Sequence, residues 1–357
     1  MKCVALQIRI HLTWIFPNYQ TPAKTISYTY RSVDPQGEGV DLSAVVYLLE
    51  TALGGTALTG ICLTNHGTIA SKDECPTKIA QLEGAFAWKN YAMVMPDYYG
   101  FGVSEDRPQG YLDAENTAHN NIDAYLAACK LLEDRNVAIP DKLYSFGYSQ
   151  GGFNSMANLK YVSLHPELGI RFDKVFCGGS PFDVQLTWEK YADATYHNSL
   201  AFVPMTVVSM NETQQLGLSY SDLFKGSLLT NWQDWVLSKN YTTSQISDKI
   251  FAAYGSDATM SSIMTEGFMS RTDTAYDTIL NVCQRYSLTT GNWTPDQETQ
   301  IILYHSKEDD TVPYDNLQAM TDFLGSEAFV STYGGWDGGH MEAVTSFITD
   351  IIVYSLW

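Results

Sequence analysis

The sequence has few basic residues for its length. Its 357 residues include 21 Lys and Arg against 40 Asp and Glu, which gives a formal net charge of −19. A nucleic-acid-binding surface needs clustered positive charge, so we exclude that class of function and expect no nucleic-acid partner. Long apolar runs are also missing, because no stretch approaches the roughly 18 to 20 residues that cross a bilayer. We therefore expect no transmembrane segment.

Cysteine spacing excludes a further class of site. Six cysteines occur without a C-x-x-C pair or a Cys/His cluster, and they are Cys3, Cys62, Cys75, Cys129, Cys177 and Cys283. Structural zinc sites need such clusters, so the sequence predicts no metal. We interpret the cysteines as buried free thiols. A bridge between Cys62 and Cys75 remains an alternative that the sequence cannot decide.

The composition is typical of a chain with a large core, since 45% of the residues are hydrophobic and 13% are aromatic. This balance excludes intrinsic disorder. The first 16 residues begin with a Lys and apolar residues, but Arg9 and His11 interrupt them and no small-residue cleavage site follows. We therefore do not identify an intact signal peptide.

Alternating segments at residues 26–33 and 42–49 flank a Pro/Gly turn cluster and predict an antiparallel hairpin. Short apolar runs typical of strands buried on both faces follow at residues 60–64, 92–95, 143–147 and 174–177. A helix is predicted at residues 118–134, with an apolar face that contains Ile122, Tyr125, Leu126, Cys129 and Leu132. Strands that alternate with helices indicate an α/β fold with a mostly parallel sheet.

The alternation stops after Pro181 and resumes near Thr299. Beyond it we expect strands at residues 300–305 and 328–333, and helices at residues 314–324 and 341–354. We assign residues 1–181 and 299–357 to the core and residues 182–298 to an insertion, because the intervening stretch is too long for an ordinary loop. The insertion is rich in aromatic residues, including Trp188, Tyr191, Trp232, Trp235 and Tyr241. We expect most of them to pack its core, with some lining a binding pocket.

The motif with the clearest chemistry is Gly147-Tyr-Ser149-Gln-Gly151, which follows a predicted strand and precedes a predicted helix. A serine on such a tight turn exposes its Oγ, and the flanking glycines tolerate the crowding. The backbone N–H of the next residue, Gln150, would help to form an oxyanion hole. Ser149 is therefore the candidate nucleophile, and a simple glycine turn is the alternative.

A serine nucleophile of this kind needs an acid and a histidine later in the chain. Glu308, Asp309 and Asp310 follow the strand predicted at residues 300–305, and composition alone does not choose among them. The segment HSKEDDTVP, residues 305–313, resembles the H-x-x-x-D-x-x-V-P pattern of α/β-hydrolases. That resemblance assigns the acid to Asp309, with Asp310 as the fallback.

The same resemblance assigns the base and a second oxyanion donor. His340, in a Gly-Gly-His-Met segment before the last predicted helix, matches the place of the catalytic base. The loop after the third predicted strand reads Thr-Asn-His-Gly-Thr and would supply a second oxyanion donor from Thr68, with Gly67 as the next choice. His305 is interpreted as a structural residue.

The run PDYYGFGVS, residues 96–104, narrows the resemblance when taken with GYSQGG, residues 147–152. Together they resemble the secretory-lipase branch of lipases and carboxylesterases in the α/β-hydrolase superfamily. The resemblance implies an α/β-hydrolase fold with an inserted, mainly helical cap over the site, and an exported enzyme that acts on small-molecule, lipid or carbohydrate esters. A mechanism that uses a serine, an acid and a histidine requires no cofactor.

We therefore expect a serine carboxylesterase or lipase in which Ser149, Asp309 and His340 form a triad and pass through an acyl-enzyme. A prolyl or aminopeptidase-type serine peptidase and an acyltransferase on the same fold are the rival enzymes. A catalytically silent binding protein is the rival from another class. The sequence does not specify the acyl group, the alcohol or the oligomeric state.

Overall fold

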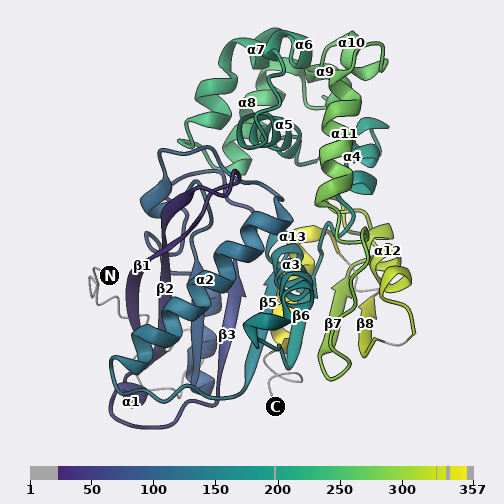
Figure 1. Ribbon diagram of the computed structural model, residues 1–357. Coiled ribbons are helices and arrows are strands. Elements are labelled where there is room, and N and C mark those ends of the chain that lie inside the picture. The colour runs from purple at the N-terminus through teal and green to yellow at the C-terminus, as the bar shows by residue number, and fades with distance from the viewer. Residues whose placement is uncertain (1–22, 197, 327, 335–337, 352–357) are drawn as a thin grey trace.

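An eight-stranded sheet forms the centre of the computed structural model, which describes residues 23–196, 198–326, 328–334 and 338–351 (Figure 1). The strand order is β1-β2-β4-β3-β5-β6-β7-β8. The strands are β1 (Ala23–Val33), β2 (Gly39–Leu49), β3 (Gly60–Asn65), β4 (Tyr91–Pro96), β5 (Leu143–Tyr148), β6 (Lys174–Gly178), β7 (Gln300–His305) and β8 (Val330–Gly334).

Strand directions follow the sequence patterns. The alternating segments β1 and β2 form an antiparallel hairpin in which Ala23 pairs with Leu49 and Val33 with Gly39, as predicted. β2 also pairs antiparallel with β4, and the other strand pairs are parallel. Every residue of β3, β4 and β5 is buried, which explains their continuous apolar runs. The predicted mostly parallel sheet is confirmed.

Helices cover both faces of the sheet, and two hydrophobic clusters fill the two interfaces. Helices α2 (Ala114–Glu133) and α3 (Gln150–Leu164) pack against each other and against the strands on one face. On the other face, η2 (Leu82–Lys89) and α13 (His340–Asp350) contribute Phe86 and Phe347 to the second cluster. The remaining helices of the core are α1 (Glu50–Leu53), η3 (Gly102–Ser104), η4 (Pro166–Leu168) and α12 (Asp315–Leu324).

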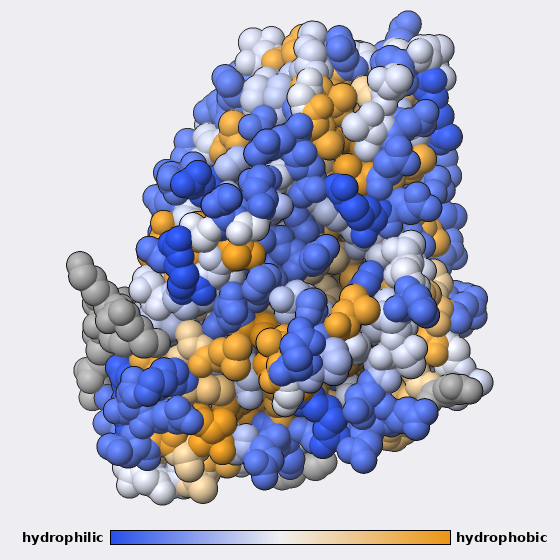
Figure 2. Space-filling model, viewed as in Figure 1, coloured by the Kyte–Doolittle hydropathy of each residue, from blue (hydrophilic) through white to orange (hydrophobic). Residues whose placement is uncertain are grey.

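The predicted apolar face of α2 was partly wrong. Leu126 is 43% exposed, while the small residues Ala124 and Ala128 are fully buried together with Leu131. Small side chains allow α2 to lie close to the sheet, so its buried stripe is displaced from the one that the largest apolar residues suggested. Figure 2 shows hydrophobic patches among hydrophilic residues on the face of the molecule where α2 lies.

The chain between β6 and β7 forms a helical insertion at one end of the sheet (Figure 1). Its helices are α4 (Val184–Ala192), α5 (Phe202–Thr213), α6 (Tyr220–Leu223), α7 (Gly226–Trp232), η5 (Gln233–Leu237), α8 (Thr243–Tyr254), α9 (Met260–Ile263), α10 (Glu266–Met269) and α11 (Ala275–Tyr286). Buried Lys239 ties this insertion to the core, because its Nζ donates to the carbonyl oxygens of Gly100 and Glu105 at 2.6 and 2.7 Å.

Three further expectations from the sequence concern a cysteine bridge, a transmembrane segment and the two ends of the chain. Cys62 and Cys75 are both buried free thiols, so the alternative of a bridge between them is wrong. No helix in the described ranges is long and apolar enough to cross a membrane. The first 16 residues, in which we do not identify a signal peptide, and the last residues of the final predicted helix lie outside the described residues.

Candidate active site

Ser149 occupies the sharp turn between strand β5 and helix α3. Its φ and ψ are 58° and −124°, a conformation that a non-glycine residue rarely adopts. Such a backbone costs on the order of 1–3 kcal/mol and persists only where the surrounding structure holds it. One such constraint is the hydrogen bond from Ser149 N to Gly178 O at 2.7 Å, which connects the turn to the end of β6. The strand–turn–helix context expected for the motif is therefore present.

The two glycines of the motif allow close backbone packing around this turn. A Cβ on Gly151 would lie 2.1 Å from the carbonyl oxygen of Asn65, and a Cβ on Gly147 would lie 2.3 Å from the carbonyl carbon of Gly151. Neither contact is possible for a real side chain. The glycines thus allow the loop after β3 to approach the turn that carries Ser149.

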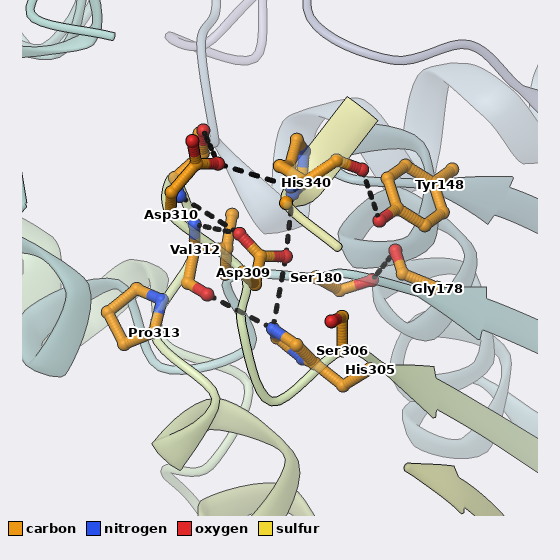
Figure 3. Close-up of polar contacts among 12 residues, drawn as sticks. Tyr148, Gly178, Ser180, His305, Ser306, Asp309, Asp310, Val312, Pro313 and His340 are labelled. Atoms are coloured by element: carbon orange, nitrogen blue, oxygen red, sulfur yellow. Dashed lines mark hydrogen bonds and ion pairs between the residues drawn. The ribbon is translucent and has the colours of Figure 1, made fainter. Parts of the chain in front are cut away.

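Asp309 and His340 form a buried hydrogen-bonded pair (Figure 3). The Nδ1 atom of His340 lies 2.7 Å from Oδ2 of Asp309, and the two residues are 5% and 4% exposed. The other carboxylate oxygen, Oδ1, accepts hydrogen bonds from the backbone N–H groups of Thr311 and Val312 at 3.0 and 2.7 Å. This arrangement fixes the ring of His340 with Nδ1 toward the acid, which leaves Nε2 free to exchange a proton.

Glu308 and Asp310 contact other groups than the His340 ring. Asp310 Oδ1 accepts from the backbone N–H of His340 at 3.1 Å, and Glu308 Oε2 accepts from the N–H of Gly338 at 2.9 Å. Both acids therefore lie at the N-terminal end of α13, where free N–H groups and the helix dipole favour negative charge. Of the three acids that the sequence left open, Asp309 is the one that contacts the imidazole ring.

His305 lies on the same carboxylate, a contact that the sequence did not predict. Its Nε2 is 3.1 Å from Val312 O and 3.4 Å from Oδ2 of Asp309, as Figure 3 shows. Burial by itself would raise the pKa of Asp309, but the hydrogen bonds from His305 and His340 outweigh it and hold that pKa well below its usual range. Asp309 is therefore a carboxylate at any pH near neutrality. The spacing of four residues between His305 and Asp309 was the available sequence signal.

Tyr148 connects the nucleophile turn to His340. Its hydroxyl donates to the carbonyl oxygen of His340 at 2.7 Å, and the two rings lie 5.0 Å apart. The hydroxyl of Ser149 has no hydrogen-bond partner among the residues that the structure describes. Hydrogen bonds between a catalytic serine and its base are often long before substrate binds. In this structure Tyr148, which directly precedes Ser149, connects the serine turn to His340.

The loop after β3 adjoins the turn that carries Ser149, since a Cβ on Gly151 would lie 3.0 Å from the carbonyl oxygen of His66. The side-chain contacts of this loop were not foreseen. The hydroxyl of Thr68 lies 3.4 Å from that of Tyr111, and His66 Nδ1 donates to Gly67 O at 2.7 Å. His66 stacks on Tyr98, and burial lowers the pKa of His66 to about 4, so the imidazole is neutral. A neutral ring at this point adds no charge to the loop.

A buried cluster of amides and hydroxyls holds this loop against α2 and α3. Asn65 Nδ2 donates to Ser155 Oγ at 2.9 Å, and Asn65 Oδ1 accepts from Asn121 Nδ2 at 2.9 Å. Asn158 and Ser145 complete the cluster, and all five residues are fully buried. Polar residues inside an otherwise apolar helix face, such as Asn121, were the signal that sequence analysis overlooked.

Ser149 lines a small pocket of about 40 Å³ beneath the insertion. One face of α4 contributes Val184, Thr187, Trp188 and Tyr191, whose spacing follows the helical repeat. A larger cavity of about 570 Å³ lies between α2, α3 and α11, and its lining includes none of the predicted site residues. We take the smaller pocket as the candidate site because it contains the strained serine.

No group of three or more His, Cys, Asp or Glu side chains suited to a metal ion occurs in the part of the chain that the structure describes. Gln150, whose N–H was predicted as an oxyanion donor, is buried as the first residue of α3.

Comparisons with known proteins identify the fold. No known protein family and no curated protein matches the sequence. Among solved structures, the rice cell wall degrading esterase LipA from Xanthomonas oryzae matches with 18% identity and a TM-score of 0.81, over 99% of this chain and 96% of that one. Candida antarctica lipase A matches with 14% identity and a TM-score of 0.69, over 100% of this chain and 80% of that one. The predicted resemblance is thus confirmed for the fold, and the chain has the α/β-hydrolase fold that these esterases and lipases share.

Proposed function

We propose that this chain is a serine hydrolase of carboxylic esters, with Ser149, Asp309 and His340 as its catalytic triad. The observation that carries the proposal is the buried Asp309–His340 pair, at 2.7 Å, linked through Tyr148 to a serine in a strained conformation. Strained residues cluster at active sites, and an acid-oriented histidine is the partner that a serine nucleophile needs. The fold adds support because it is shared with known esterases.

The proposed reaction proceeds in two steps. Ser149 Oγ attacks the carbonyl carbon of the ester while Nε2 of His340 takes its proton, and the tetrahedral intermediate then releases the alcohol, which receives that proton. Water attacks the acyl-enzyme in the second step, with His340 again taking a proton and returning it to Ser149 as the acid departs. Asp309 stays ionised throughout and stabilises the imidazolium form of His340.

Backbone N–H groups would stabilise the negative oxygen of the intermediate. We assign this role to Gln150 N–H, at the start of α3, and to Thr68 N–H in the loop after β3. The contact of Asn65 O with the glycines of the serine turn supports this pairing, since it fixes one loop against the other. Loss of one such donor costs about 3 kcal/mol in comparable enzymes.

The pocket favours ester hydrolysis over the rival activities. A peptidase that binds a substrate amine needs an acidic side chain in its pocket, and none lines the pocket in the described part of the chain. An acyltransferase would use the same triad but requires an acceptor other than water to enter. A silent binding protein would not need a buried acid–histidine pair that orients Nε2.

The proposal also includes the organisation of the chain. Residues 182–298 act as a cap over the site, and residues 1–181 and 299–357 form the catalytic core. The substrate is a small-molecule, lipid or carbohydrate ester. An extracytoplasmic location, which the esterase that degrades rice cell walls suggests, belongs to the proposal as well.

A fluorophosphonate probe tests the proposed function directly, because it reacts with activated serines. We expect wild-type protein to be labelled on Ser149 and to hydrolyse p-nitrophenyl acetate. The Ser149→Ala variant should lose both properties while it keeps the melting temperature of the wild type. Full activity of Ser149→Ala would contradict the serine mechanism, and a silent wild type would support the binding protein instead.

A further inference from the structure

The pocket beside Ser149 is small, and its size limits what can occupy it. Its volume is about 40 Å³, whereas a water-sized group needs roughly 10–15 Å³ on this scale. Room therefore exists for about three such groups. A chain of two to four carbons fits this space, whereas a fatty acyl chain would extend beyond it.

Charged side chains are missing from the pocket lining within the described residues. The lining has Leu112, Pro181, Val203 and Val312 among its apolar members, and its polar members are uncharged. A buried ion without a partner is strongly disfavoured in such surroundings. A carboxylate or an ammonium group on the acyl chain would therefore find no compensating charge.

Several contacts fix the walls of the pocket. Tyr191 donates its hydroxyl hydrogen to Thr311 O at 3.1 Å, which ties α4 to the loop that carries Asp309. Tyr111 of the core stacks on Phe202 of α5, with ring centroids 6.4 Å apart, and the Tyr111 N–H donates to Ser209 Oγ at 2.7 Å. Residues from both the core and the insertion thus hold the walls of the pocket in place.

These observations separate the aromatic residues of the insertion into two groups. Trp188, Tyr191 and Phe202 line the pocket that contains Ser149. Trp232 instead stacks on Tyr220 at 3.6 Å, away from this lining. Within the insertion, the residues that line this pocket come from α4 and the first two turns of α5.

We propose that the enzyme acts on esters of short, uncharged acyl groups of two to four carbons, and that Phe202 is a wall residue that limits acyl length. This inference rests on the proposed function and specifies its substrate class. A longer chain would have to displace the stacked pair of Tyr111 and Phe202. Overfilling a packed site of this kind is disfavoured.

The test is the rate of hydrolysis of p-nitrophenyl esters with acyl chains from acetyl to decanoyl. We expect kcat/KM to be highest between acetyl and butanoyl and at least about 100-fold lower for octanoyl. Succinyl and 4-aminobutanoyl esters, which are of butanoyl length but charged, should also react at least about 100-fold more slowly than butanoyl. An optimum at octanoyl or beyond, or equal rates for the charged esters, would overturn the inference.

Phe202→Ala and Phe251→Ala form a matched pair. Both phenylalanines are half-buried in the insertion, but only Phe202 lines the pocket. Phe202→Ala should raise the octanoyl-to-acetyl ratio of kcat/KM at least about tenfold, and Phe251→Ala should leave that ratio within about twofold. Equal changes in both variants would show that Phe202 does not set acyl length.

The inference and the proposed function fail in different ways. Fluorophosphonate labelling of Ser149 together with a preference for long acyl chains would reject the short-acyl inference and leave the hydrolase intact. Absence of labelling and of hydrolysis for every ester would reject the proposed function. Thermal melts of each variant show whether an altered rate comes from unfolding.

Discussion

Asp309 receives His340 Nδ1 on the same carboxylate oxygen that lies 3.4 Å from His305 Nε2. The shorter contact, 2.7 Å, belongs to His340, and the backbone N–H groups of Thr311 and Val312 occupy the other oxygen. Every strong acceptor position of the acid is therefore engaged by its own loop or by a histidine.

Asp309→Asn should lower kcat by up to about 10⁴-fold with little change in the fold. An amide in place of the carboxylate favours the wrong tautomer of His340 and removes the charge that stabilises imidazolium. Asp310→Asn is the matched control, because Asp310 meets the backbone N–H of His340 rather than its ring. We expect a loss of less than about tenfold for this control in steady-state kinetics, and a reversed order would assign the acid to Asp310.

His305 should act as a positioning residue for Asp309. His305→Phe removes the donor and should lower kcat by about 10- to 100-fold, while His305→Gln, whose amide nitrogen can reach the place of Nε2, should restore most of it. Loss of one donor also makes Asp309 a stronger base, so the acidic limb of the kcat/KM profile should move to higher pH in His305→Phe. A profile that stays in place, with kcat and thermal stability reduced together, would limit His305 to packing.

Gly151→Ala should be strongly destabilising although the added group is a single methyl. Its Cβ would lie 2.1 Å from Asn65 O, so the loop after β3 or the serine turn must move. We expect the free energy of unfolding to fall by about 1–3 kcal/mol in urea titrations, together with most of the activity. Gly54→Ala is the control, since its nearest neighbour would be Thr51 O at 3.4 Å. An active, fully stable Gly151→Ala would contradict the packing described for this turn.

His66 should make the fold sensitive to acid. Burial lowers the pKa of His66 to about 4, whereas an unfolded chain protonates histidine near 6.5. Between these values the unfolded state binds the extra proton, so the free energy of unfolding falls as pH drops from about 6.5 to 4, by on the order of 3 kcal/mol. The lowered pKa of Asp309 acts in the same direction but at lower pH.

Urea unfolding at pH 7 and pH 4.5 would measure this effect in wild type and in His66→Gln. The variant should lose less stability on acidification than the wild type by on the order of 2 kcal/mol. His165→Gln serves as the control because His165 lies near the surface, beside Glu167. Identical pH dependence in wild type and His66→Gln would show that His66 is already charged, or accessible, in the folded protein.

Strand and helix positions were largely predictable because local patterns determine them. The β5 run and the G-x-S-x-G motif place Ser149 at a strand-to-helix turn without reference to the rest of the chain. The exposed Leu126 was mispredicted because hydrophobicity alone does not register the tight packing that Ala124 and Ala128 allow. Small residues carry a packing signal that a periodicity of large apolar residues misses.

Contacts within the site were less predictable, because they depend on how distant segments meet. Only Asp309 contacts the His340 ring, while Glu308 and Asp310 contact the N-terminal end of α13. Which acid meets the ring depends on where α13 begins relative to the acid loop. The cluster around Asn65 joins β3, α2, α3 and β5, and no local pattern describes it. Which insertion aromatics face Ser149 likewise follows from the docking of α4 and α5.

The central claim, that Ser149 forms an acyl-enzyme, is tested most directly by trapping that intermediate. Protein mixed with excess p-nitrophenyl acetate would be quenched in acid within milliseconds to seconds and digested for mass spectrometry. We predict a burst of nitrophenol, and a peptide containing Ser149 whose mass has increased by one acetyl group. Asp309→Asn should show the same adduct formed far more slowly, and Ser149→Ala none. Turnover of the ester with no adduct on Ser149, or an adduct on another residue that Ser149→Ala does not abolish, would contradict the account.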